Sequence, residues 1–260
     1  MKRPVITLLT DFGSMDHYVG AMKGVMLGIC PTAQFVDVSH EVAPYAIPEG
    51  AYTLAQVWQC FPKGTVHLIV VDPGVGSARR PILLEAAGHR FVAPDNGVLT
   101  MVFDAAEKHK VRHITAVRYF RKPVSRTFHG RDIFAPVAAH VASGLSTIRV
   151  GKRIEDYVRL DFGRPIRKGP KAFIGAILKI DRFGNVITNF ASEQWLKRQP
   201  FEMRIGGRAV SHLASNYAEM KAGELFLIGG SAGYLEVSMN QGSAAAALGT
   251  RVGASVELFL

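Results

Sequence analysis

The chain has little cysteine and no long apolar run. Its two cysteines, Cys30 and Cys60, fit neither a disulfide framework nor the spacing of metal ligands. Each lies in an apolar stretch of helical character, so we expect small buried thiols and a reducing, cytoplasmic compartment. No stretch is long enough for a transmembrane helix, and Thr10 and Asp11 interrupt the apolar run Val5–Leu9 before it could form the core of a signal peptide. We therefore expect no membrane partner.

Acidic residues are scarce relative to basic ones. The 21 acidic and 31 basic residues give a net charge of +10, which raises the question of an anionic partner. The basic residues gather in segments 112–131 and 149–171, but proline, glycine and apolar residues interrupt them, so they form no single helical stripe. Aromatic residues that could stack on a single strand lie among these cations: Tyr119, Phe120, Phe128 and Phe134. We favour a solvated surface without a nucleic-acid partner and keep a basic nucleic-acid-binding protein as the rival hypothesis.

Strand-like and helix-like patterns alternate over the first 145 residues. The expected strands are 5–9, 35–38, 66–71, 90–93 and 113–117, and the expected helices are 17–29, 51–61, 98–108 and 132–142. Strands separated by helices need crossover connections, which are typical of a parallel or mixed sheet. This half of the chain therefore predicts an α/β domain.

The composition changes near residue 145. Glycine, proline and basic residues fill the stretch to about residue 170, which favours an interdomain connection. Short extended runs follow at 173–180, 186–190, 201–205, 225–228, 234–238 and 256–259, with a short alanine helix at 244–247. We expect an N-terminal α/β domain with a mostly parallel central sheet over residues 1–165. A smaller C-terminal all-β, barrel-like domain is expected over residues 166–260.

Asp72 and Arg79 share one glycine-rich loop. The apolar run Leu68–Val71 is typical of a strand buried on both faces, and Pro73 and Gly74 end it. Asp72 is therefore expected at the carboxyl edge of the sheet, where open α/β sheets bind their ligands. A turn-forming Asp-Pro pair followed by a solvated arginine explains the segment equally well.

Further polar residues follow the same pattern. Asp11, with Asp16 beyond it, comes after the first strand and suits either a helix cap or a carboxylate that binds a vicinal diol. His129 precedes the helix predicted from residue 132. A lone histidine is more often structural than catalytic, but His129 would join the acid and arginine of the glycine-rich loop if the strands are adjacent.

Two glycine-containing segments mark the second domain. Asp181–Asn189 combines an acid, an aromatic ring and an amide, which suits an ammonium group and an aromatic base, and a β-hairpin turn explains it equally well. Gly229–Glu236 could hold a carboxylate through backbone N–H groups, although turn glycines account for it without a ligand.

Taken together, these motifs resemble those of one family, the S-adenosyl-L-methionine (SAM) hydroxide adenosyltransferases, which are related to the fluorinating and chlorinating enzymes that use the same substrate. The matching segments extend over nearly the whole chain: Thr10–Gly13, Val71–Gly76, Ala93–Gly97, Thr127–Asp132 and Asp181–Asn189. Five matches in the same order are far more specific than any one of them. The resemblance implies hydrolysis of SAM to adenosine and L-methionine.

The resemblance also implies an assembly and a site. It implies a homotrimer whose sites form where the first domain of one subunit meets the second domain of its neighbour, with no cofactor and no metal. It assigns Asp72, Arg79 and His129 to a water-activating triad and Asp11 to the ribose diol. The expected substrate-binding residues are Asp11, Asp16, Tyr45, Asp181, Phe183, Asn185, Phe226, Ser231, Tyr234 and Met239, the last through its backbone.

The sequence departs from the halide-using relatives at three positions of this pattern. Those enzymes have Tyr at the position of Asp72, Thr at that of Val75 and Ser at that of Gly130. The loss of these hydroxyls, with a charged triad in their place, argues for water as the nucleophile, and chloride is the alternative. Ala232 replaces an arginine that helps to hold the methionine carboxylate in the fluorinating enzymes, so that contact is left open.

Overall fold

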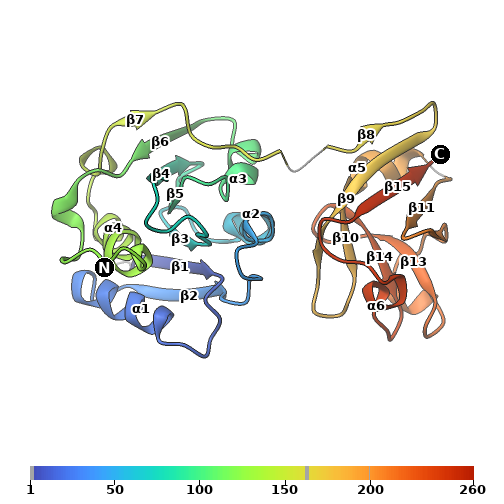
Figure 1. The fold of residues 1–260 in the computed structure, drawn as a ribbon, viewed down its shortest axis with the longest axis horizontal. Coiled ribbons are helices and arrows are strands. Elements are labelled where there is room, and N and C mark those ends of the chain that lie inside the picture. Colours follow the sequence, from blue (N-terminus) through green and yellow to red (C-terminus); the bar gives the residue numbers. More distant parts are fainter. Residues whose placement is uncertain (1–2, 162–163, 199) are drawn as a thin grey trace. The chain divides into compact units, whose positions relative to one another are not determined.

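The computed structural model describes residues 3–161, 164–198 and 200–260. The chain divides into two compact units, Met1–Leu160 and Asp161–Leu260 (Figure 1). The boundary expected from the sequence, between residues 165 and 166, stays a prediction. No helix among the described residues is long and apolar enough to cross a membrane.

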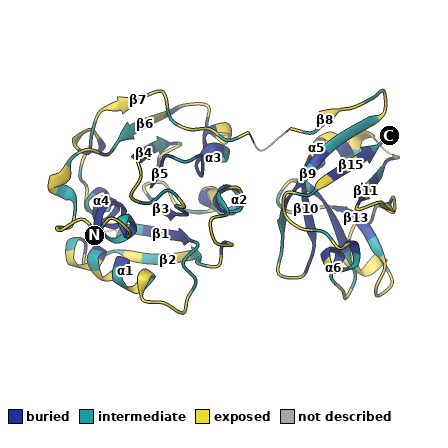
Figure 2. Ribbon diagram, viewed as in Figure 1, coloured by how far each residue is buried: buried dark blue, intermediate teal, exposed yellow. Residues whose placement is uncertain are grey.

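The first unit is built on a seven-stranded mixed sheet. Its strands are β1 (Val5–Thr10), β2 (Gln34–Ser39), β3 (Val66–Val70), β4 (Pro81–Ala86), β5 (His89–Pro94), β6 (His109–His113) and β7 (Arg153–Ile154). They lie in the order β2-β1-β3-β5-β4-β6-β7. The first four strands in this order are parallel to one another. Each of the next three, β4, β6 and β7, is antiparallel to the strand before it in the order. Figure 2 shows β1, β3 and β5 almost completely buried, as expected for strands covered on both faces.

Helices cover both faces of this sheet. One face packs against α1 (Tyr18–Ile29) and α4 (Ala135–Ala142), and the other against α2 (Ile47–Val57) and α3 (Thr100–Ala105). Short helical turns complete the unit at Trp58–Cys60, Val117–Tyr119, Gly130–Phe134 and Thr147–Arg149. Because the parallel strands β1, β3 and β5 end at the same edge, the loops that carry Asp11, Asp72 and Asp95 meet there.

The second unit is a nearly closed antiparallel sheet. Its strands are β8 (Ile166–Arg167), β9 (Ala172–Ile180), β10 (Val186–Ala191), β11 (Glu202–Ile205), β12 (Arg208–Val210), β13 (Leu225–Gly229), β14 (Tyr234–Met239) and β15 (Ser255–Phe259). They follow the order β12-β11-β15-β9-β10-β14-β13, with β8 beside β9. Leu213, in the segment after β12, forms an isolated parallel bridge with Leu227 on β13, so the two ends of this strand order come close together. Two short helices, α5 (Ser192–Trp195) and α6 (Ala244–Leu248), pack on the core that the sheet encloses.

The predicted fold class is confirmed, and several boundaries are wrong. The strand expected at 113–117 is wrong: β6 spans His109–His113 and ends where the expected strand was to begin, because the N–H groups of Thr115 and Ala116 both donate to the carbonyl of Val150. The helix expected at 98–108 spans only Thr100–Ala105. The helix expected at 51–61 begins at Ile47, where Pro48 occupies the first turn.

Two further differences concern strands and thiols. Strands β4, β7, β8 and β12 were not expected. The last three are only two or three residues long, whereas β4 is a six-residue strand with the apolar run Ile82–Leu84 that sequence reasoning missed. Cys30 is buried as expected, but the expectation for Cys60 is wrong, since that thiol is exposed in the turn after α2.

Candidate active site

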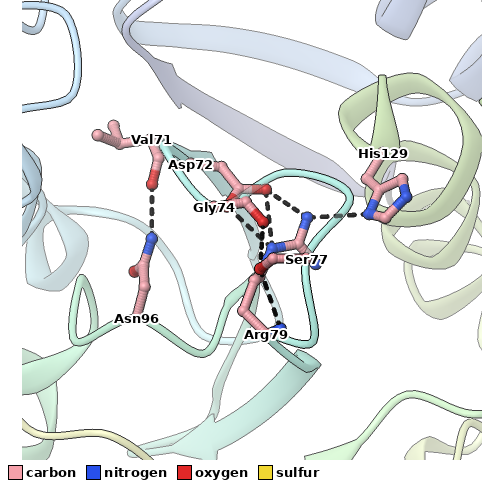
Figure 3. A network of polar contacts seen from close by, with 7 residues as sticks. All are labelled: Val71, Asp72, Gly74, Ser77, Arg79, Asn96 and His129. Atoms are coloured by element: carbon pink, nitrogen blue, oxygen red, sulfur yellow. Dashed lines mark hydrogen bonds and ion pairs between the residues drawn. The ribbon is translucent and has the colours of Figure 1, made fainter. Parts of the chain in front are cut away.

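Asp72 and Arg79 form a bidentate ion pair on the loop between β3 and β4. The Arg79 Nε lies 2.9 Å from both carboxylate oxygens of Asp72, and Nη2 also donates to Oδ2 (Figure 3). The side chains of Asp72 and Arg79 are only 4% and 9% exposed. A parallel fork between guanidinium and carboxylate is a strong, directional contact, so the two groups hold each other at the sheet edge.

Two consecutive turns give this loop its shape. The N–H of Val75 donates to the carbonyl of Asp72, and both the N–H and the hydroxyl of Ser77 donate to the carbonyl of Gly74. Gly76 has a φ of +79°, and a Cβ at this position would lie 2.3 Å from the carbonyl oxygen of Arg126. Only glycine fits there, because the backbone conformation is left-handed and a second segment approaches closely.

His129 is the third member of this group. Its Nδ1 lies 3.0 Å from the Arg79 Nη2 (Figure 3). A guanidinium can only donate, so Nδ1 accepts and the ring proton is on Nε2. Burial, and then the charge of Arg79, lower the pKa of His129 below its usual range. The imidazole is therefore neutral at neutral pH.

A buried carboxylate fixes the segment that carries His129. Asp132 is fully buried and accepts hydrogen bonds from Arg121, Arg131 and the N–H of Ser125, the shortest at 2.8 Å. Burial alone would raise its pKa, but these hydrogen bonds lower it below the usual value. Sequence reasoning missed this role, although the signal was there in an acid flanked by several arginines.

Asp11 occupies the same sheet edge. Its Oδ2 accepts the backbone N–H of Tyr45 at 2.9 Å, so the helix-cap hypothesis for this residue is wrong. Burial outweighs that hydrogen bond, and together with the nearby charge of Asp72 it raises the pKa of Asp11. Tyr45 is 73% exposed, with a left-handed φ of 67°, and Asp16 is exposed on the loop before α1.

Asn96, which follows the neighbouring strand β5, holds the start of the Asp72–Arg79 loop. Its Nδ2 donates to the carbonyl of Val71 at 2.9 Å, and its Oδ1 accepts the N–H of Val98 (Figure 3). Asp95 beside it pairs with Arg80 at 2.7 Å. The polar residues after β5 thus support the backbone on both sides of the Asp72–Arg79 loop.

The second unit contains a pocket of about 590 Å³. Four predicted substrate-binding residues line it, namely Asp181, Phe183, Asn185 and Met239. The other lining residues are Tyr217, Asn240, Gln241 and Gly242. Sequence reasoning missed Tyr217, which lies in an irregular segment between β12 and β13 with no motif around it.

Asp181 organises the turn between β9 and β10. One of its carboxylate oxygens accepts the N–H groups of Phe183 and Asn185, and the other accepts the Asn185 side-chain amide, all at 2.9 Å. The hairpin interpretation of this segment is therefore correct, and the same turn also faces the pocket. Phe183 is 76% exposed there, which leaves its ring available for a ligand.

The structure does not bring the remaining predicted residues into this pocket. Phe226 is fully buried on β13, where its ring packs edge-on against Tyr217. Ser231 is exposed in the tight turn between β13 and β14, and Tyr234 begins β14. Their substrate contacts stay predictions.

The chemistry available at the sheet edge follows from these groups. A carboxylate, a permanent cation and a neutral imidazole that can donate through Nε2 are suited to hold a polar nucleophile and to accept its proton. Among the described residues, no group of three or more His, Cys, Asp or Glu side chains is placed to hold a metal ion.

Comparison with known proteins agrees with this chemistry. The chain is 38% identical to the (R)-S-adenosyl-L-methionine hydrolase of Thermus thermophilus, over 98% of this chain and 99% of the relative. It is 38% identical to the (R)-S-adenosyl-L-methionine hydrolase of Salinispora tropica, covering 96% and 95%. A fluorinase of Nocardia brasiliensis is 28% identical over 72% of this chain and 71% of that enzyme.

A solved structure shows the same fold. An uncharacterized conserved protein from Thermotoga maritima matches with a TM-score of 0.91 and 38% identity, over 98% of this chain and 100% of that one. The sequence model of the SAM hydroxide adenosyltransferase N-terminal domain matches residues 6–151, and that of the C-terminal domain matches residues 175–257. The chain therefore belongs to the SAM hydroxide adenosyltransferase family.

Proposed function

We propose that this protein hydrolyses S-adenosyl-L-methionine to adenosine and L-methionine. The observation that carries the proposal is the contact of Arg79 with both Asp72 and His129 at the carboxyl edge of the parallel strands. Family membership and the names of the relatives support the same reaction.

The reaction depends mainly on activating the nucleophile, because the leaving group needs no assistance. Water forms a bond to C5′ of the ribose while the bond from C5′ to the sulfonium sulfur breaks, and methionine leaves as a neutral thioether that needs no acid. Bulk water has a pKa of about 15.7, and a nearby cation lowers it by favouring hydroxide. Arg79 supplies that permanent charge.

The hydrogen-bond directions assign the other two roles. The Nδ1 of His129 already accepts from Arg79, so the imidazole can orient the water only as a donor through Nε2. Asp72 has carboxylate lone pairs left beyond those used by Arg79 and is the group that accepts the proton of the water. The proton then passes to solvent.

Substrate recognition uses the acids and the amide described above. Asp11 accepts hydrogen bonds from the ribose diol, and Asp181 pairs with the α-ammonium of the methionine part. Asn185 and the backbone at Met239 hold the adenine, and Phe183 offers an apolar surface beside them. We further propose a cytoplasmic homotrimer in which the two halves of each site come from neighbouring subunits.

The nearest alternative keeps the substrate and uses chloride as the nucleophile. Val75 and Gly130 offer no side-chain hydroxyl to a halide, and the charged Asp72 repels one. The test incubates the purified protein with SAM, with and without chloride, and separates the nucleosides. Adenosine as the main product in both reactions supports hydrolysis, whereas a 5′-halogenated nucleoside as the main product would contradict it.

The rival from another class, a nucleic-acid-binding protein, finds little support. Phe128 and Phe134 are buried, and Tyr119 and Phe120 pack on the core of the first unit, so these rings form no exposed stacking surface. We expect only weak, sequence-independent affinity for RNA that fades steeply with added salt. Tight binding to one RNA at physiological salt would reverse this ranking.

A further inference from the structure

Glu236 is the acidic residue of the buried part of β14, which otherwise consists of Leu235, Val237 and Ser238. It lies in the middle of β14 and is only 7% exposed, between Leu235 and Val237, which are completely buried. Its cross-strand partners are Ile187 on β10 and Ile228 on β13. Neither partner can form a salt bridge with the carboxyl group, so its charge must be balanced by other groups or absent.

The carboxyl group lies directly under the glycine-rich turn between β13 and β14. A Cβ at Gly230 would be 1.8 Å from Oε1 of Glu236, so a larger residue there would displace the carboxyl group. The hydroxyl of Tyr217 hydrogen-bonds to Glu236, and the charge of Asp181 acts on it from the turn between β9 and β10. Both Tyr217 and Asp181 line the pocket of the second unit, so Glu236 is linked to that pocket from two sides.

We propose that Glu236 is a positioning residue for the two positive groups of the substrate, the α-ammonium and the sulfonium, acting through Tyr217 and beside Asp181. This inference rests on the proposed function, because it takes SAM as the ligand of the pocket. The methionine part of SAM carries these two positive groups and one negative α-carboxylate, a net charge of +1. A second acid on the side of the pocket that holds Asp181 attracts the two positive groups and disfavours the α-carboxylate there, so it helps to orient the methionine part.

The electrostatics of the pocket are consistent with this role. Burial, and then the charge of Asp181, raise the pKa of Glu236 to about 7, while the hydrogen bond from Tyr217 lowers it. The residues opposite Glu236 on β10 and β13 are uncharged. A ligand with a net positive charge favours the ionised carboxylate, so binding releases a proton to solvent and becomes tighter as the pH rises through 7.

The test compares KM and kcat for adenosine formation between pH 6 and pH 9. The variant is Glu236→Gln, and the matched control is Glu257→Gln, an exposed glutamate on strand β15 of the same unit. At pH 8.5 we expect Glu236→Gln to raise KM roughly tenfold, corresponding to one pKa unit of lost coupling, with kcat within about twofold. At pH 6 the wild-type carboxyl group is already neutral, so the two KM values agree.

The ratio of the two KM values is the readout, because titration of the substrate's own amino group affects both proteins equally. A ratio that is the same at pH 6 and pH 8.5, or a fall in kcat alone, would overturn the role of Glu236. The proposed function is judged separately, by whether the wild-type protein forms adenosine at all.

A second variant keeps the test decisive if Glu236→Gln does not fold. Tyr217→Phe keeps the ring that packs on Phe226 and removes only the hydroxyl. Since that hydroxyl lowers the pKa of Glu236, its removal moves the pH at which KM changes to a higher value. A folded Tyr217→Phe protein with an unshifted KM profile would contradict the proposal.

Discussion

The Nη2 of Arg79 lies 3.0 Å from the Nδ1 of His129, while the same guanidinium holds both oxygens of Asp72. Arg79 is therefore the central group of the site, and it makes its contacts through a planar fork. A lysine has the same charge but only one nitrogen, which cannot face two carboxylate oxygens and an imidazole together.

We expect Arg79→Lys to lower kcat by roughly 10- to 100-fold, because the charge remains but the orientation of Asp72 and His129 is lost. KM for SAM should change little, since Arg79 is not among the proposed substrate-binding groups. Steady-state kinetics check this. An unchanged kcat would make Arg79 a structural ion pair of the loop.

The tautomer of His129 predicts how kcat changes as the pH is lowered. Protonation would place a hydrogen on Nδ1, against the Arg79 guanidinium, and the pKa of His129 is lowered accordingly. We expect kcat at saturating substrate to be constant from pH 8 down to about 6.5, the ordinary histidine value, and to fall only below it. A fall centred above pH 6.5 would contradict this assignment.

Two neighbouring histidines in the sheet, His67 and His89, predict sensitivity to acid. His67 is completely buried, and its Nδ1 and Nε2 lie 2.8 Å from Thr7 Oγ1 and 3.1 Å from His89 Nδ1. Burial, and then His89, lower the pKa of His67 to about 3. Between pH 6.5 and that value the unfolded chain binds more protons than the folded one, so stability falls as the pH falls.

At pH 5 this linkage costs roughly 2 kcal/mol relative to pH 7. We expect His67→Gln, which cannot titrate, to show a smaller loss of unfolding free energy between pH 7 and pH 5 than the wild type. Urea titrations at the two pH values measure it. His17→Gln, at an exposed histidine of the same unit, is the control and should keep the full loss.

The conformation of Gly76 indicates that the Asp72–Arg79 loop is tightly constrained. We expect Gly76→Ala to destabilise the first unit by about 2–4 kcal/mol, because it adds a left-handed φ penalty to the contact with the Arg126 carbonyl. Gly24→Ala is the matched control, since Gly24 lies in α1 with open space around it and should gain about 0.5–1 kcal/mol. Thermal or urea unfolding of both variants checks the contrast, and equal stabilities would contradict it.

Mixing of subunits tests the proposed shared site. Asp72→Ala and Asn185→Ala should each be inactive alone, because each removes one half of the site. Refolded together, they should regain part of the activity, since some interfaces in a mixed trimer combine two intact halves. If both variants form trimers and the mixture is no more active than its parts, each site is built within one chain.

Much of the fold followed from local patterns, and its errors have local causes. The apolar runs of β1 and β3 predicted buried parallel strands because burial on both faces leaves no alternation of polar residues. The boundary at His113 could not be predicted, since it depends on the remote carbonyl of Val150. Strand β4, which pairs with β5 and β6, was missed although its apolar run Ile82–Leu84 is a strand signal.

The site shows the same division. The segments of Asp72 and Asp181 could be predicted because each is a glycine-containing turn after an apolar run, and the polar side chains of the site lie in these turns. Tyr217 carries no such mark, since it begins a short helical turn between β12 and β13. Glu236 ends the glycine-rich segment Gly229–Glu236, but its burial within β14 could not be predicted from that segment. Their significance arises only when the closed sheet brings them together.

The exposure of Cys60 gives the protein a practical property. Cys60 leads into the amino end of β3, whereas Asp72 follows its carboxyl end, and the five residues of the strand span about 16 Å at 3.3 Å each. The other thiol, Cys30, is buried. A maleimide dye therefore has one accessible attachment point, and it labels the edge of the sheet opposite to the chemistry.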